Sequence, residues 1–171
     1  MELAELGRRI YATAHLTGEF VLRSGQTTSE YFDKYRFEAD PVLLDTVAEA
    51  MVPLVPADTE VLAGLEMGGI PVVTALGRHT GLPCAFVRKQ AKPYGTRRLA
   101  EGAETAGRRV TIVEDVVTTG GQIVLSATDL RALGAHITDV LCVINRNSTT
   151  PAPLTEAGLT LTALLTPEHL G

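Results

Sequence analysis

Short apolar runs alternate with amphipathic segments along most of this 171-residue chain. Five runs predict buried strands, because they are short, apolar and mostly rich in β-branched residues. They are Val61–Ala63, Cys84–Val87, Val110–Val113, Val140–Ile144 and Leu159–Leu165. Strand–helix alternation at this spacing builds right-handed crossovers between parallel strands. The pattern therefore predicts an α/β fold with a central, mostly parallel five-stranded sheet flanked by helices.

Three of the intervening segments carry helical periodicity. Apolar residues recur at helical spacing after Pro41, after Pro71 and after the glycines at 120–121. The second of these segments ends at Gly81 and the third at Gly134, where glycine suits the end of a helix. These segments supply the helices that the parallel sheet needs.

The first forty residues depart from the alternation. Leu3, Leu6, Ile10 and Ala14 predict one short amphipathic helix. Two segments around a Ser-Gly-Gln turn at 24–26 then predict a hairpin, namely Phe20–Arg23 and Glu30–Arg36. A chain of this length forms one domain. We therefore expect a single domain over residues 1–171, with a hood segment at 1–40 and an α/β core at 41–171.

Charge and composition exclude several functional classes. The chain carries 15 Lys and Arg against 20 Asp and Glu, a net charge of −5, so a general nucleic-acid surface is not expected. It has no run of about 18 apolar residues that would span a membrane, and its acidic, amphipathic start is unlike a signal peptide. Cys84 and Cys142 lie in apolar segments and are expected to be free thiols. We expect a cytoplasmic protein.

One basic segment stands out against this acidic background. Arg88–Arg98 holds five of the fifteen basic residues and no acid. With Pro93 and Gly95 inside it, it predicts a loop rather than a strand or a helix. It follows directly on a buried strand, at the carboxyl edge where α/β sheets bind ligands. We therefore expect a mobile cationic loop that closes over a polyphosphate.

The segment Val110–Gln122 carries the clearest signal of a site. A buried strand delivers two adjacent carboxylates, Glu114 and Asp115, and a Thr-Thr-Gly-Gly turn at 118–121 then opens a helix. Hydroxyls and backbone N–H groups beside a helix N-terminus form a cradle for one phosphate. The carboxylates would repel that phosphate, so we expect them to accept hydrogen bonds from sugar hydroxyls. Together these features predict a ribose 5-phosphate site.

With this motif the chain resembles the type I phosphoribosyltransferases, and in particular their orotate-specific members, along nearly its whole length. The acid pair and the Thr-Gly turn match the signature of that family. Four further segments, in the family's order, resemble its hood, its pyrophosphate loop, its flexible catalytic loop and its base-side strand end. They are Phe20–Lys34, Leu62–Pro71, Arg88–Gly95 and Val143–Arg146.

The resemblance implies transfer of ribose 5-phosphate from phosphoribosyl pyrophosphate (PRPP) to orotate, giving orotidine 5'-monophosphate and pyrophosphate in UMP biosynthesis. It implies that ribose phosphate is bound by Glu114, Asp115, Val116, Val117, Thr118, Thr119, Gly120 and Gly121. It places the pyrophosphate beside Gly68, Gly69, Arg88, Lys89, Lys92 and Tyr94. It places orotate beside Arg23, Tyr31, Phe32, Thr118 and Arg146. The implied catalytic residues are Arg88, Lys89, Lys92 and Asp115.

The resemblance also implies a cofactor and an assembly. Mg²⁺ would be carried by PRPP, with no direct protein ligand and a contact through water to Asp115. A homodimer would place the Arg88–Gly102 loop of one subunit in the site of the other. Such a reaction needs chiefly an oriented base and cations that stabilise the leaving group in a water-excluded site.

Three positions depart from the family's pattern. Arg23 stands where the family usually has lysine, and Tyr94 stands where many members have histidine. Near the base, the family typically has an Asp before Arg146 and an acid-plus-glycine turn after it, and the segment Asn145–Thr150 of this chain has neither. Two alternatives therefore remain open, a phosphoribosyltransferase for another base and a non-catalytic regulator that binds PRPP. Arg23 favours orotate, since a purine brings no carboxylate.

Overall fold

The structure is a computed structural model that describes residues 1–170. Its main sheet has six strands, which are β3 Val61–Leu65, β4 Cys84–Val87, β5 Ala100–Gly102, β6 Arg109–Val117, β7 His136–Asn145 and β8 Thr160–Leu165. They lie in the order β5-β4-β3-β6-β7-β8. Five strands are mutually parallel and only β5 pairs antiparallel. The expected α/β class and the five expected strands are confirmed.

One helix precedes the first parallel strand, and three others connect β3 to β4, β6 to β7 and β7 to β8. They are α3 Pro41–Met51, α4 Gly69–Thr80, α5 Gly121–Ala132 and α6 Ala152–Glu156, and a 3₁₀ turn at Val52–Leu54 follows α3. Helix α3 begins after Asp40, whose carboxylate accepts hydrogen bonds from the N–H groups of Val42 and Leu43, both at 3.0 Å. None of the described helices combines the length and apolarity that a membrane crossing requires.

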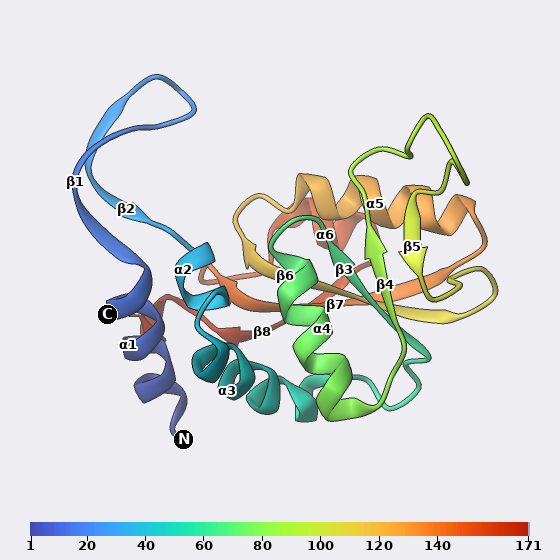
Figure 1. Cartoon of the computed structure of the whole chain (residues 1–171), viewed down its shortest axis with the longest axis horizontal. Helices are drawn as coiled ribbons and strands as arrows, with labels where there is room; N and C mark the ends of the chain where they lie inside the picture. Colours follow the sequence, from blue (N-terminus) through green and yellow to red (C-terminus); the bar gives the residue numbers. More distant parts are fainter. Residues whose placement is uncertain (171) are drawn as a thin grey trace.

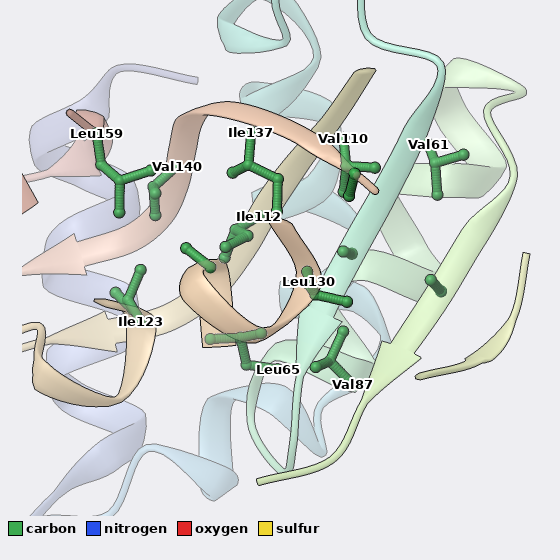
Figure 2. Close-up of a cluster of buried hydrophobic side chains, with 14 of the residues drawn as sticks. Val61, Leu65, Val87, Val110, Ile112, Ile123, Leu130, Ile137, Val140 and Leu159 are labelled. Carbon is green, nitrogen blue, oxygen red and sulfur yellow. The ribbon is translucent and has the colours of Figure 1, made fainter. Parts of the chain in front are cut away.

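Apolar side chains cover both faces of the sheet. Figure 2 shows the cluster on one face, where Ile123 and Leu130 of α5 pack against strand residues that include Ile112 and Val140. The opposite face packs against α3, α4 and the N-terminal segment through residues such as Phe37 and Leu76. Strand β3 is buried at all five positions, as expected for a strand covered on both sides.

The N-terminal segment contains α1 Leu3–Ala14, the hairpin strands β1 His15–Val21 and β2 Thr27–Phe32, and the short helix α2 Tyr35–Glu38. The expected helix and hairpin are present, and the hairpin projects from the rest of the molecule (Figure 1). The sequence prediction of a strand over Glu30–Arg36 was wrong beyond Phe32. There the chain turns into α2, because Phe37 inserts into the core while Tyr35 and Arg36 stay exposed.

The sixth strand comes from the segment that the sequence assigned to a loop. Residues 89–99 form no helix or strand, as expected, but Ala100–Gly102 pairs with β4. Gly102 pairs with Ala85 in this ladder, and the position requires glycine, since a Cβ atom there would lie 2.6 Å from the carbonyl oxygen of Cys84. The β4–β5 pair therefore anchors both ends of a projecting basic loop, which we call the cationic loop (Arg88–Leu99; Figure 1).

The chain ends beside its own beginning. After β8 a 3₁₀ turn at Pro167–His169 packs against α1, where a Cβ atom on Gly7 would collide with the backbone of His169. The N-terminal segment is thus fastened to the end of the sheet, at the side of β8.

Candidate active site

The acid pair lies near the carboxyl end of β6, and its two members have different surroundings. Asp115 is completely buried. Its Oδ1 accepts a hydrogen bond of 2.7 Å from the backbone N–H of Val116, and its Oδ2 lies 2.7 Å from the ammonium Nζ of Lys34. Glu114 is partly exposed, and its Oε1 accepts a hydrogen bond of 3.2 Å from the N–H of Asp115. Glu114 is therefore the carboxylate that a sugar can reach in this conformation.

A third carboxyl group joins this cluster from α2. Glu38 is buried, and burial beside Asp115 raises its pKa to about 9. Burial next to Asp115 likewise raises the pKa of Glu114 to about 8. Although burial opposes ionisation, the neighbouring Glu38 carboxyl and the Lys34 ammonium hold the pKa of Asp115 below its ordinary value. At neutral pH the cluster thus consists of one ion pair, Lys34–Asp115, and two carboxyl groups that are largely protonated.

The Thr-Thr-Gly-Gly turn follows the acid pair and opens α5. Gly120 has a φ of +78°, and a Cβ atom there would lie 2.9 Å from Leu154, so this position requires glycine. The hydroxyl-bearing residues Thr118 and Thr119 are exposed. The first N–H groups of a helix have no intrahelical acceptor, which makes this exposed turn a cradle for an anion. The structure brings together the residues predicted to bind the 5-phosphate.

The segment Asn145–Thr150, which departs from the family's pattern, supports this cradle. The side-chain amide of Asn147 donates a hydrogen bond of 2.7 Å to the carbonyl oxygen of Thr118. Asn145 accepts a hydrogen bond of 3.1 Å from the N–H of Asn147 and donates one of 3.1 Å to the carbonyl of Thr149. The segment is therefore an ordered turn that ties the end of β7 to the phosphate turn.

The predicted pyrophosphate loop lies between the acid pair and the cationic loop. A Cβ atom on Gly68 would lie 1.8 Å from Oδ2 of Asp115, so only glycine allows this loop to approach the acid. On the other side, the backbone N–H of Lys89 donates a hydrogen bond of 2.6 Å to the carboxylate of Glu66. The predicted Gly68–Gly69 and Arg88–Lys89 subsites are thus adjacent at the carboxyl ends of β3 and β4.

Two of the cations predicted to bind pyrophosphate lie close to a carboxylate of the neighbouring strand β5. The ammonium of Lys92 lies 2.8 Å and the guanidinium of Arg88 lies 3.8 Å from Oε1 of Glu101 on β5. Bonding to Lys92 lowers the pKa of Glu101. Tyr94 is exposed, and the ammonium of Lys92 lies 5.9 Å from the centre of its ring. Arg88 and Lys92 are thus held near one carboxylate at the β5 edge of the sheet.

A cavity of about 880 Å³ lies between α1, the hairpin and the end of β7. Tyr31, Phe32 and Arg146, three of the residues predicted to contact orotate, line it. The guanidinium of Arg146 lies 5.2 Å from the centre of the Phe32 ring. Arg23 is not among the lining residues, because it lies in the exposed turn between β1 and β2 at the far end of the projecting hairpin (Figure 1).

Sequence reasoning missed four residues of this region. Lys34 and Glu38 contact the acid pair, Glu101 binds the loop cations and Asn147 supports the phosphate turn. The rarity of lysine, at three residues in the chain, is the one signal that singles out Lys34. Glu38, Glu101 and Asn147 carry no local signal in the sequence. Each interacts with a residue of another element, and the sequence alone does not show that these elements are close in space.

Comparison with known proteins agrees with this geometry. Residues 39–158 match the family model described as a phosphoribosyl transferase domain. The chain is 51% identical over 167 residues to an orotate phosphoribosyltransferase of Nocardioides sp., covering 98% of this chain and 93% of that protein. It is 40% identical over 153 residues to an orotate phosphoribosyltransferase of Halobacterium salinarum, covering 90% and 87% respectively.

Solved structures extend the similarity to three dimensions. The orotate phosphoribosyltransferase of Mycobacterium tuberculosis in complex with inorganic phosphate gives a TM-score of 0.86 at 27% identity, covering 99% of this chain and 98% of that one. The same protein in complex with PRPP gives a TM-score of 0.83 at 27% identity, with the same coverage. These similarities confirm the fold class and the family that the sequence motifs indicated.

Proposed function

Because the chain belongs to the phosphoribosyl transferase family, we propose that it transfers the ribose 5-phosphate of PRPP to orotate, releasing pyrophosphate. The observation that carries this proposal is the arrangement at the carboxyl ends of the parallel strands. Acid pair, phosphate turn, pyrophosphate loop and cationic loop all meet there. The 51% identity to a full-length orotate phosphoribosyltransferase supports orotate as the acceptor base.

Binding of the ribose phosphate follows from the turn and the acid pair. The N–H groups at the start of α5 and the exposed hydroxyls of Thr118 and Thr119 receive the 5-phosphate. Glu114, the more accessible carboxyl group, accepts hydrogen bonds from the ribose hydroxyls, and Asp115 lies directly behind it.

Displacement at the anomeric carbon leaves negative charge on the departing pyrophosphate. Arg88, Lys89 and Lys92 supply cations for that charge when the loop closes, and closure excludes water from the site. The oxygen donors of the acid pair suit a hard cation, and Mg²⁺ bound to PRPP would share the neutralisation of the pyrophosphate. No direct protein ligand would be needed for this. A contact between Asp115 and the hydrated ion through water would require the Lys34–Asp115 pair to open, because Asp115 is completely buried in this conformation.

The base pocket supplies orientation. Phe32 offers an aromatic face, and Arg146, which also lines the cavity, lies over it. A carboxylate-bearing pyrimidine would pack on the ring and pair with the guanidinium. Tyr31 and, once the hairpin bends over the cavity, Arg23 complete the enclosure. In this proposal residues 1–40 act as the hood of a single domain, and residues 41–171 form its α/β core.

The assembly and location belong to the same proposal. A homodimer in which the cationic loop reaches the partner's site accounts for a loop that projects from the edge of the sheet (Figure 1). The two free thiols, Cys84 and Cys142, support a reducing compartment, the cytoplasm.

A spectrophotometric assay tests the proposal. Purified protein is incubated with PRPP and Mg²⁺, and with orotate, uracil, hypoxanthine or xanthine in turn. We expect orotate to be consumed with release of pyrophosphate, and only when both PRPP and Mg²⁺ are present. Faster turnover of a purine would indicate a transferase for another base. PRPP binding without turnover of any of the four bases would favour a regulator.

A further inference from the structure

The Lys34–Asp115 ion pair joins the N-terminal segment to a buried acid of the site. Among the described residues, it is the one ion pair between these two parts. Asp115 is completely buried, and the Lys34 side chain is 33% exposed, so the pair lies at the boundary between core and site. A charge-assisted bond of 2.7 Å in such a position restricts both partners strongly.

The position of Lys34 in the chain connects two subsites. Phe32, which lines the base pocket, ends β2 two residues earlier, and Lys34 lies at the N-cap of α2. Asp115 immediately precedes the residues of β6 that lead into the phosphate turn. One side chain therefore joins the base pocket to the ribose phosphate site.

Removal of the ammonium would leave the Asp115 carboxylate among other acids. Glu38 from α2 and Glu114 from β6 face it, and Gly68 from the pyrophosphate loop closes the remaining side. The N–H of Val116 would remain as its hydrogen-bond donor from the backbone. A buried carboxylate that loses its ion-pair partner is costly, so it would rotate or draw in water. Either change displaces the acid pair relative to the phosphate turn.

We propose that Lys34 is a positioning residue for PRPP binding, because its ammonium fixes the Asp115 carboxylate and thereby holds the hood in register with the ribose phosphate site. The inference rests on the proposed function in so far as PRPP is the ligand. Lys34 acts through Asp115 and needs no contact with the substrate itself.

The test measures PRPP binding directly, by titration calorimetry in Mg²⁺ buffer without orotate, together with steady-state kinetics. For Lys34→Met we expect the dissociation constant and the KM for PRPP to rise by about ten- to a hundredfold, the size of a lost charged hydrogen bond. The kcat at saturating PRPP should change less than about threefold, since bound ligand restores the geometry. A merely structural residue would lower the melting temperature and leave these constants unchanged.

Three further variants sharpen the result. Lys34→Arg keeps the charge and should recover most of the affinity. Arg36→Met removes an exposed cation from the same short helix and should bind PRPP like the wild type. In the Asp115→Asn background, Lys34→Met should add less than about a twofold further loss, because contacts that work through one carboxylate are not additive. The double variant removes both charges of the pair, so no unpaired charge is left buried. If Lys34→Met alone does not fold, PRPP binding is compared between this double variant and Asp115→Asn.

The outcomes separate the two proposals. PRPP affinity of Lys34→Met within twofold of the wild type overturns the role of Lys34 and leaves the transferase function intact. Wild-type protein that binds PRPP but does not consume orotate overturns the transferase function, while the affinity of Lys34→Met still decides the role of Lys34. Wild-type protein that does not bind PRPP overturns both.

Discussion

Asp115, Glu114, Glu38 and Lys34 show at the residue scale how this chain concentrates polar groups that ordinary cores avoid. Three carboxyl groups and one ammonium share a largely buried space next to the phosphate turn. Such groups remain buried only when they are paired or protonated. The Lys34–Asp115 pair and the raised pKa of the other two carboxyls meet that condition. Perturbed carboxyl groups clustered in one cleft are typical of functional sites.

The pKa of Glu38 leads to a prediction about stability and pH. Burial raises this pKa to about 9 from an ordinary value of 4.5, so the protonated form favours the folded state. The stability that this proton contributes is complete below pH 4.5 and is lost as the pH rises through 9. Glu38→Gln, whose amide has no proton to lose in this range, should therefore show a smaller fall of melting temperature between pH 6 and pH 9.

The comparison isolates Glu38 from its neighbours. Lys34, Asp115 and Glu114 also face this carboxyl, and Glu114 titrates in the same range, but all three are common to both proteins. Melting curves recorded at each pH by differential scanning fluorimetry give the two slopes. Parallel slopes for the wild type and Glu38→Gln would show that Glu38 is already ionised at neutral pH.

Arg146 carries a prediction about the base. In the proposed function its guanidinium pairs with orotate beside Phe32. Arg146→Ala should lower kcat/KM for orotate by one to two decades, on the order of 1.5–3 kcal/mol for a lost charged hydrogen bond. Calorimetry should give a nearly unchanged PRPP affinity. The exposed Arg108→Ala serves as control, and equal losses for both substrates would assign Arg146 a structural role.

At the scale of elements, the cationic loop and β5 form one unit. The strand pair β4–β5 brings Glu101 close to Arg88 and Lys92, so these two of the loop's cations already share a carboxylate before any pyrophosphate arrives. PRPP therefore has to compete with Glu101 for these two cations.

Glu101→Gln should bind PRPP more tightly, because Lys92 no longer has to leave a carboxylate. Partly exposed ion pairs contribute about 0.2–1 kcal/mol, which corresponds to a one-and-a-half- to fivefold lower dissociation constant. Glu104→Gln, which releases Arg98 instead, provides a matched control. Calorimetric titration with PRPP measures both. Weaker binding by Glu101→Gln would mean that Glu101 builds the loop rather than occupying its cations.

At the scale of the whole molecule, the two projecting segments of Figure 1 carry residues assigned to the site. The hairpin holds Arg23 in its outer turn, and the loop holds Lys92 at the opposite edge of the sheet. A two-fold dimer would let each subunit use the loop of its partner reciprocally. The sites would then be complete only in the assembly.

Subunit exchange tests this arrangement. Lys92→Ala and Asp115→Asn homodimers should each be nearly inactive. After mixing, half of the dimers are hybrids with one doubly damaged and one intact site, so roughly a quarter of all sites should regain orotate turnover. Native mass spectrometry confirms that hybrids have formed. Hybrids without recovered activity would show that the loop serves its own subunit.

The sequence by itself determined the strand–helix alternation, the position of the acid pair and the phosphate turn. These features depend on local periodicity and on contiguous residues such as Glu114 to Gly121, whose geometry is set by a strand leading into a helix. The two elements that the sequence analysis missed depend instead on contacts with distant parts of the chain. The helix at Tyr35–Glu38 and the strand at Ala100–Gly102 form because distant partners, the core around Phe37 and the edge of β4, override the local pattern.

Only the tertiary structure decided that Glu114 is the accessible acid of the pair and that Lys34 binds the buried one, Asp115. Residues 34 and 38 approach residue 115 because the fold places α2 beside Asp115 of β6, and no pattern along the chain encodes that contact. The same holds for Glu101 under the loop cations and for Asn147 beside Thr118. The physical reason is that a buried ion pair depends on desolvation and on a distance of a few ångströms between elements, and both exist only once the layers have packed.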